Sequence, residues 1–147
     1  MIDENVNDHL QRLIRYKNEL TGISRKSRDE FLNDHLLIAA TERLFQLAIE
    51  SCINVANKIL SIEQFDKPVK PPETYADIFR ELGTLEIISK SFTEKLITMT
   101  KFRNRLVHMY WEVDKEELYK YLTGNLEDFQ TFIDFIVNYY NSKNRKF

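Results

Sequence analysis

Apolar residues recur along the chain at the three- and four-residue spacing of amphipathic α-helices, and the alternation typical of β-strands does not occur. The first such stretch covers residues 6–20, and Gly22 is expected to end the helix that it predicts. The next opens at Ser27 and Glu30, which have the spacing of a capping box, and predicts the longest helix, roughly residues 28–60. This helix is apolar around much of its circumference, which is typical of the central helix of a bundle.

Three prolines fall within residues 61–73 and predict the one substantial loop, because proline removes a backbone donor and disfavours helix in the residue before it. Thr74 and Asp77 resemble a helix cap. The short helix that they open is expected to reach about residue 82 and to break at Gly83.

A further helix is predicted to open at the capping box of Ser91 and Glu94 and to carry apolar residues on one face as far as Tyr110. Asp114 is expected to cap a short helical segment, and a last helix follows over about residues 126–140. Together these patterns predict an all-α fold, an up-and-down helical bundle of about four to six helices.

The last helix has two apolar sides. One, with Phe129 and Ile133, can face the bundle, whereas the other, with Phe132, Phe135 and Tyr139, needs cover of its own. Because a soluble protein rarely leaves an aromatic row exposed, a homodimer interface along this helix is our hypothesis.

The length and composition of the chain suit a single helical domain, which we place at residues 1–147. Hydrophobic residues make up 43% of the chain, and only three glycines and three prolines interrupt it, which favours long helices. The net charge of −2 and the pI near 6.0 supply no general attraction to nucleic acid. A nucleic-acid function would therefore need a local basic patch.

Cys52 is the only cysteine, which excludes an internal disulfide and a thiolate-rich metal site, and we expect it to be buried and inert. The first residues do not resemble a signal peptide, and no apolar run has the length of a membrane span. A cytoplasmic protein without a membrane partner is therefore expected.

Arg103 is the single charge in an otherwise apolar row of its predicted helix, and an unpaired buried cation is too costly to persist. It needs either a cleft or a carboxylate partner, for which Glu42 is the candidate because it interrupts an apolar stripe in the same way. His108 lies about 140° from Arg103 around an ideal helix. The two converge only if the arginine reaches round, if the helix ends near His108, or if a second protomer brings them together.

The pattern alone leaves structural interpretations open for the other polar residues. His108 is compatible with a half-buried, hydrogen-bonded side chain, and Tyr110 with an amphipathic aromatic at the edge of the bundle. His9 and His35 are expected to be a surface residue and a packing residue, respectively.

Arg103, His108 and Tyr110 match an Arg-x4-His-x-Tyr signature, and on this motif the sequence resembles HepT-like proteins of the HEPN superfamily. The long second helix adds a family-like Gln-x-x-x-Glu spacing at Gln46 and Glu50. The resemblance extends from the first predicted helix to the last, although only the motif is specific.

This resemblance implies a homodimeric, metal-independent endoribonuclease toxin that needs no cofactor, with the two motifs facing one another across a cleft. His108 would act as general base on the ribose 2′-hydroxyl, and Arg103 would stabilise the charge of the phosphorane. Asn104, which often follows the arginine in this family, and Lys101 would have supporting roles. The local positive patch that RNA requires would come from four basic residues, Lys95, Lys101, Arg103 and Arg105.

The same resemblance implies a partner protein. HepT-like toxins pair with a minimal nucleotidyltransferase antitoxin that adds AMP to the motif tyrosine, which corresponds to Tyr110 here. Such a group adds negative charge and bulk beside the cleft, so the modified toxin would repel RNA phosphates.

The alternative is a non-catalytic helical module in which Arg103 pairs with Glu42 and the cleft binds a partner protein or a nucleotide. In that case Arg103→Ala would orphan a buried charge and destabilise the fold by roughly 3–5 kcal/mol, whereas an arginine in a cleft would matter little to stability. A purely structural dimeric bundle ranks last, because it leaves the polar row of Lys101, Asn104 and His108 unexplained.

Overall fold

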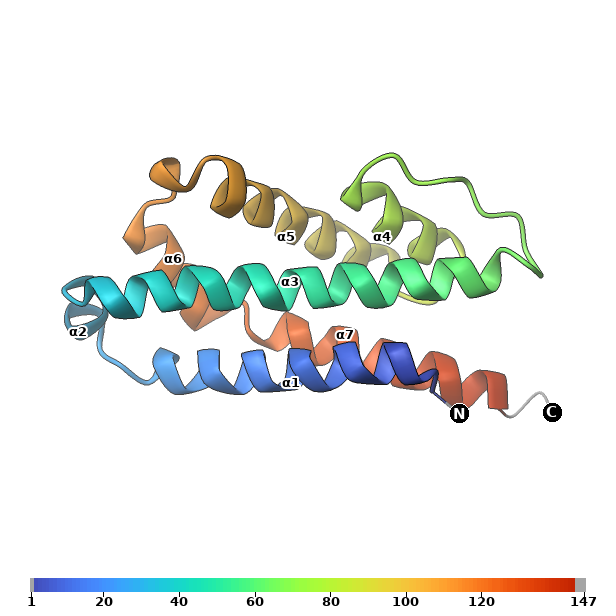
Figure 1. Cartoon of the computed structure of the whole chain (residues 1–147), viewed down its shortest axis with the longest axis horizontal. Helices are drawn as coiled ribbons and strands as arrows, with labels where there is room; N and C mark the ends of the chain where they lie inside the picture. Colours follow the sequence, from blue (N-terminus) through green and yellow to red (C-terminus); the bar gives the residue numbers. More distant parts are fainter. Residues whose placement is uncertain (1, 145–147) are drawn as a thin grey trace.

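The computed structural model describes residues 2–144, and no β-strand occurs among them. They form seven α-helices and a short 3-10 helix, with these bounds: α1 Glu4–Ser24, α2 Arg28–Leu32, α3 His35–Glu63, α4 Tyr75–Thr84, α5 Lys90–His108, η1 Tyr110–Glu112, α6 Lys115–Gly124 and α7 Glu127–Asn144 (Figure 1). The predicted all-α bundle is confirmed, with more helices than the four to six expected.

The long helices run up and down about α3, which crosses the middle of the molecule in Figure 1. α1 and α7 lie along one side of α3, and α4 and α5 lie along the other. α6 and the short α2 close the end of the bundle where α5 finishes. α3 packs against helices on both sides, so its role as the central helix is confirmed.

An aromatic cluster in the core joins four of these helices. Phe45 of α3 meets Phe102 of α5 edge-on, with ring centroids 5.7 Å apart. Phe102 also stacks on Tyr121 of α6 at 3.9 Å, and Phe129 of α7 lies 6.2 Å from Phe45. Aromatic contacts of this kind stabilise the fold by more than the burial of their apolar area alone. Phe102 directly precedes Arg103, so the cluster fixes the part of α5 that carries the motif.

Three predicted caps are confirmed, whereas the long second helix is interrupted. Ser27, Thr74 and Asp114 each accept a hydrogen bond from a backbone N–H of the helix that follows. The region predicted as one helix is divided between α2 and α3, because Asp34 caps α3 by accepting a bond from the backbone of Leu37 at 3.0 Å. Short polar side chains favour this local bond over continued helix.

The two predicted glycine stops are wrong. α1 passes through Gly22 to Ser24, and Gly83 lies inside α4. A Cβ atom at Gly83 would lie 2.5 Å from the side-chain oxygen of Thr93, so this glycine allows α4 to approach α5 closely. The capping box at Ser91 is also wrong, since Ser89 caps α5 by accepting a bond from the backbone of Phe92.

The second aromatic side of α7 is covered by the chain itself. Phe132 is fully buried and meets Phe79 of α4 edge-on at 6.3 Å, and Phe135 packs on Phe92 of α5 at 5.4 Å. Tyr139 donates its hydroxyl to Glu63 at the end of α3. The prediction that this row needs a second copy of the protein is therefore wrong, because α4 and α5 supply the cover.

Cys52 lies in the core of the protein, whereas His35 lies at its surface. Cys52 is buried, as predicted, and burial raises the pKa of its thiol far above the usual value. His35 is exposed at the start of α3, so the prediction that it packs is wrong. Within residues 2–144, no helix combines the length and hydropathy that crossing a membrane requires.

Candidate active site

A cavity of about 500 Å³ lies where the C-terminal half of α5 meets the start of α4, above α3 in Figure 1. Three of the predicted site residues line it, namely Arg103, Asn104 and His108 of α5. The rest of the wall comes from α3 and from the segment that opens α4, through Asn57, Pro72, Glu73, Thr74, Tyr75 and Ile78. The fold therefore brings the polar residues of the motif to one hollow.

α5 ends at the cavity that Arg103 and His108 both line. α5 stops at His108, and Met109 leaves the helical conformation with φ −141° and ψ 42°. The last turn closes with a bond from the Met109 amide to the carbonyl of Arg105. A helix end near His108, one of the three conditions considered, is therefore present. Within the single chain, Arg103 and His108 already line the same cavity.

Arg103 is held by Glu50 of α3 and not by the predicted partner Glu42. Its Nε and Nη2 atoms donate to one carboxylate oxygen of Glu50 at 3.1 and 2.7 Å. Gln46, one turn earlier, donates to the same oxygen at 3.1 Å. The Arg103 side chain is 12% exposed and that of Glu50 29%. The expectation of a mostly buried ion pair was right, but the carboxylate was misassigned.

The outer part of the guanidinium faces α4 and the cavity. The ring of Tyr75 lies 5.1 Å from the guanidinium carbon of Arg103, and the Nη1 atom donates to the side chain of Asn104 at 3.2 Å. An arginine has five N–H donors, of which these bonds use three. The arrangement fixes the orientation of the guanidinium and leaves donors for an anionic ligand.

His108 and Tyr110 are more exposed than the structural interpretations suggested. His108 lies exposed at the cavity wall, and among residues 2–144 its imidazole has no hydrogen-bond partner. Tyr110 was predicted to lie on the long helix, but it lies in η1, where its side chain is 62% exposed. The motif therefore spans a helix, its final residue and a separate turn.

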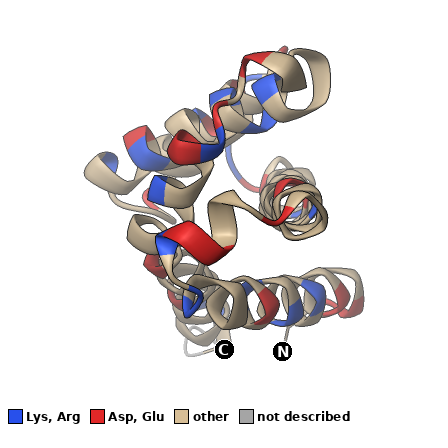
Figure 2. Ribbon diagram, turned by 90° about the vertical axis from the view of Figure 1, so that its left-hand side faces the viewer, with Lys and Arg blue, Asp and Glu red and all other residues tan. Residues whose placement is uncertain are grey.

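The expected basic patch is largely neutralised. Arg105 donates to both carboxylate oxygens of Glu117 at 2.5 and 2.9 Å, and Lys95 lies 3.9 Å from a carboxylate oxygen of Asp128. Figure 2, which views the end of the bundle where α5 finishes, shows basic and acidic segments close together. Lys101 is exposed but does not line the cavity. The prediction of a positive patch of four residues is therefore wrong, because three of them have carboxylate partners.

Sequence reasoning missed Asn57 and Tyr75. The pattern of α3 marks Asn57 only as a polar position, and Tyr75 follows the proline-containing loop with no signal that it would cover an arginine. Both reach the cavity through the packing of three helices, which a single helical period does not specify.

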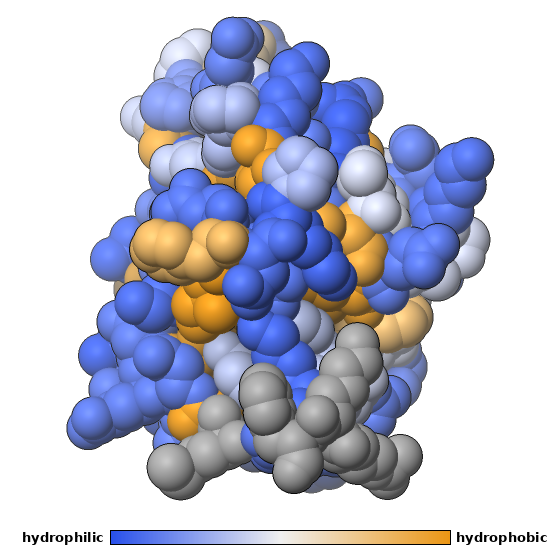
Figure 3. All heavy atoms as spheres, turned by 90° about the vertical axis from the view of Figure 1, so that its right-hand side faces the viewer, coloured by the Kyte–Doolittle hydropathy of each residue, from blue (hydrophilic) through white to orange (hydrophobic). Residues whose placement is uncertain are grey.

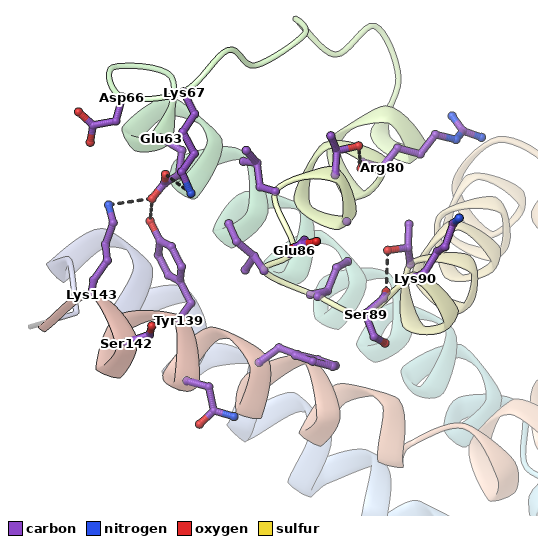
Figure 4. Close-up of a pocket in the computed structure, with 18 of the residues that line it drawn as sticks. Glu63, Asp66, Lys67, Arg80, Glu86, Ser89, Lys90, Tyr139, Ser142 and Lys143 are labelled. Carbon is purple, nitrogen blue, oxygen red and sulfur yellow. Dashed lines mark hydrogen bonds and ion pairs between the residues drawn. The ribbon is translucent and has the colours of Figure 1, made fainter. Parts of the chain in front are cut away.

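A second, larger hollow of about 1310 Å³ lies at the opposite end of the bundle and contains none of the motif residues. It opens between the end of α3, the turn from α4 to α5 and the end of α7 (Figure 4). Figure 3 shows this end of the molecule, where small apolar patches lie among polar side chains. At its edge, the buried Glu63 binds Lys143 at 2.8 Å and accepts the hydroxyl of Tyr139.

These contacts join α3 to α7 and make a pH-dependent contribution to stability. Burial raises the pKa of Glu63, but the bonds from Lys143 and Tyr139 lower it further, so the net pKa lies below the ordinary value. A carboxyl whose pKa is lowered by folding stabilises the protein above the pKa of the unfolded chain. That contribution is lost as the pH falls through the folded-state pKa.

Tyr139→Phe should therefore lower the free energy of unfolding at neutral pH by about 1.5–3 kcal/mol, the usual value of a hydrogen bond to a charged group. Urea titrations of both proteins should show this difference shrinking as the pH falls through the pKa of Glu63. Tyr119→Phe is the matched control, because the Tyr119 hydroxyl donates to the neutral carbonyl of Lys26. A Tyr139→Phe effect that does not change with pH would contradict the assignment.

A sequence model of the family described as Ribonuclease HepT-like matches residues 3–136, which include the whole cavity. The chain belongs to the HepT-like ribonuclease family. The resemblance inferred from the motif is confirmed, and the prediction of a ribonuclease is confirmed at the level of the family.

Two curated relatives in this family are similar over most of the chain. One is the tRNA nuclease HepT of Aphanizomenon flos-aquae, 26% identical over 136 residues, which cover 91% of this chain and 88% of the relative. The other is the mRNA nuclease HepT of Shewanella oneidensis, 30% identical over 107 residues, which cover 73% of this chain and 77% of the relative.

Solved structures of other proteins share the fold. The tri-AMPylated HEPN toxin of Shewanella oneidensis, in complex with an MNT antitoxin, superimposes with a TM-score of 0.84 at 24% identity, covering 93% of this chain and 99% of that one. The cytosolic protein YutE of Bacillus subtilis, of unknown function, gives a TM-score of 0.75 at 18% identity, with 93% and 92% covered.

Proposed function

We propose that this protein is a metal-independent endoribonuclease toxin. The observation that carries the proposal is the cavity that Arg103, Asn104 and His108 line together, which has in its wall a guanidinium held by Glu50 and an imidazole with no hydrogen-bond partner among residues 2–144. A general base and a positioned cation are the two groups that cleavage by the ribose 2′-hydroxyl requires. The curated relatives named as tRNA and mRNA nucleases support RNA as the substrate class.

In this mechanism His108 takes the proton of the 2′-hydroxyl as the 2′-oxygen attacks the adjacent phosphorus. The bond from phosphorus to the 5′-oxygen breaks, and the leaving oxygen takes a proton from water. The products are a 2′,3′-cyclic phosphate and a 5′-hydroxyl. Arg103 stabilises the negative charge of the phosphorane through the donors that Glu50 does not use, and Asn104 orients the phosphate. Lys101 contributes positive charge from outside the cavity.

The test is cleavage of a labelled, structured RNA by the purified protein in EDTA, with analysis of the ends of each product. We expect cleavage to cyclic-phosphate and 5′-hydroxyl ends without added metal. Intact mass must first show that Tyr110 carries no modification. If the unmodified protein leaves the RNA intact, the ribonuclease proposal fails, and a module that binds a partner protein or a nucleotide becomes the better interpretation.

We also propose that a minimal nucleotidyltransferase antitoxin inactivates the protein by transferring AMP to Tyr110. The tyrosine hydroxyl attacks the α-phosphate of ATP and displaces pyrophosphate. The exposure of Tyr110, two residues from His108, supports this, as does the AMPylated toxin that resembles the chain in fold. The added phosphate and adenosine would stand beside the cavity and oppose the entry of RNA phosphates.

Co-expression with the cognate transferase should therefore yield protein with AMP on Tyr110 and little cleavage activity, whereas Tyr110→Phe should stay unmodified and active. Peptide mass spectrometry and the RNA assay measure the two effects. Tyr119→Phe serves as the control, since this tyrosine lies on α6 outside the cavity. Modification that persists in Tyr110→Phe would locate the acceptor elsewhere.

The active form that we propose is a homodimer with the two motifs facing across a cleft. The aromatic row of α7 is covered within the chain and no longer supports a dimer. An exposed apolar face at the start of α3 supports it instead, because Leu36 is 84% exposed and Ala39 and Ala40 are also exposed. Sedimentation should show a dimer at micromolar concentration that Leu36→Asp weakens. A wild-type monomer under those conditions would contradict the dimer while leaving the chemistry of each cavity intact.

A further inference from the structure

Three consecutive apolar side chains stand in solvent directly after His108. Met109 is 40% exposed, Tyr110 62% and Trp111 68%. The rings of Tyr110 and Trp111 meet edge-on, with centroids 5.4 Å apart and planes at 80°. Large aromatic side chains are rarely left in solvent together unless they bind something. The proposed chemistry uses Tyr110 only as the site of modification and gives Trp111 no role.

The backbone holds this pair in a defined place. The Glu112 amide donates to the carbonyl of Met109 at 2.9 Å, and the Val113 amide donates to the carbonyl of Tyr110 at 3.2 Å. Arg105 reaches from α5 to the carbonyl of Glu112 at 3.4 Å. Arg105 is itself held by Glu117 of α6. The aromatic pair is thus held by these bonds in the turn that directly follows His108, the last cavity residue of α5.

The charge distribution points to the kind of ligand. RNA-binding proteins commonly gain affinity from cations that neutralise phosphates. Here Arg103, Arg105 and Lys95 already have carboxylate partners, so charge supplies little of that affinity. An unpaired RNA base offers a flat face that stacks on an aromatic ring independently of charge. Trp111 presents such a ring three residues from the imidazole.

We propose that Trp111 stacks on a base of the RNA next to the scissile phosphate and thereby positions that phosphate for Arg103 and His108. This inference rests on the proposed ribonuclease function and adds the contact that recognises the substrate. It makes an unstacked base, in a loop or a single strand, a requirement for cleavage.

Because Trp111 is the only tryptophan of the chain, its fluorescence reports this contact directly. The first experiment titrates the wild-type protein with a single-stranded 2′-O-methyl oligonucleotide, which lacks the attacking hydroxyl and is not cleaved. We expect quenching that saturates with binding. An abasic oligonucleotide of the same length carries the same phosphates and should leave the emission unchanged. Equal quenching by both oligonucleotides, or none by either, overturns the proposal.

The second experiment compares Trp111→Leu and Trp111→Phe with the wild type. Trp111→Leu keeps an apolar side chain but removes the ring, so the Kd for the oligonucleotide, measured by anisotropy, should rise about 5- to 150-fold, the range expected for one stacked base. The Kd of Trp111→Phe for the same oligonucleotide should lie between those of the wild type and Trp111→Leu. With saturating RNA, kcat should change less than KM, because Arg103 and His108 are untouched.

The outcomes separate this inference from the function on which it rests. If the wild type cleaves RNA and Trp111→Leu binds and cleaves it equally well, stacking is wrong and the ribonuclease stands. If the bases quench Trp111 but no RNA is cleaved, stacking holds and the catalytic proposal fails. Emission that shifts to the blue as protein concentration rises without RNA would place Trp111 between two copies and overturn the inference.

Discussion

His108→Ala is expected to lower the rate of RNA cleavage by about 10²–10⁴-fold, the usual contribution of a general base. His108 is the only histidine that lines the cavity within residues 2–144. An alanine there removes the proposed acceptor of the 2′-hydroxyl proton and leaves Arg103 and Glu50 in place. Single-turnover kinetics with saturating enzyme would measure the chemical step without a contribution from binding.

The stability of this variant should be unchanged, because the imidazole is exposed and has no hydrogen-bond partner among residues 2–144. Equal melting temperatures would show that lost activity is a loss of chemistry. His35→Ala is the matched control, since His35 is an exposed histidine at the start of α3, away from the cavity. A His108→Ala protein that cleaves like the wild type would rule out the mechanism.

Arg103→Ala is expected to lower kcat/KM by at least about 10²–10³-fold, the effect of removing one preorganised group that stabilises transition-state charge. The substitution also leaves the carboxylate of Glu50 without its cation next to the site of an incoming phosphate. Arg103→Lys should recover only part of the loss, since an ammonium cannot bond Glu50 through two nitrogens and hold a phosphate as well. The same RNA assay measures both variants.

Stability alone does not distinguish this role from the non-catalytic alternative. Arg103→Ala should cost about 1–3 kcal/mol, because Glu50 is partly exposed and keeps its bond from Gln46. Arg28→Ala is the control: it removes another arginine–glutamate pair that joins two helices, α2 and α6, but lies outside the cavity. If both variants lose activity equally, the arginine of the motif acts only through the fold.

Sequence periodicity predicted the features that depend on a single helix. The long apolar stripes, the caps at Ser27, Thr74 and Asp114, and the proline-containing loop are all encoded within a few turns of their own segment. The same holds for the motif itself, which lies on one helix and the turn that follows. Local spacing predicted most of these local interactions, although it missed the caps at Asp34 and Ser89.

Several of the incorrect predictions depend on how helices lie against each other. Glu42 and Glu50 both interrupt an apolar face of α3, and the axial position of α5 along α3 decides which of them meets Arg103. No pattern within either helix specifies that position. Gly83 was taken as a helix breaker because the approach of Thr93 from α5 is not visible in its neighbours along the chain. The cover over Phe132 was missed for the same reason.

The break between α5 and η1 has a consequence for local motion. Arg103 lies inside a 19-residue helix packed on the core, whereas Tyr110 lies in a three-residue turn whose side chains are already exposed. Opening that turn breaks few bonds and uncovers only the half-buried Val113, so its opening free energy should be small, while that of central α5 should approach global stability. Amide hydrogen exchange should therefore be fast over residues 110–113 and slow over residues 99–104. The proposed transferase could then reach Tyr110 while Arg103 stays in place, so that modification would not require α5 to unfold.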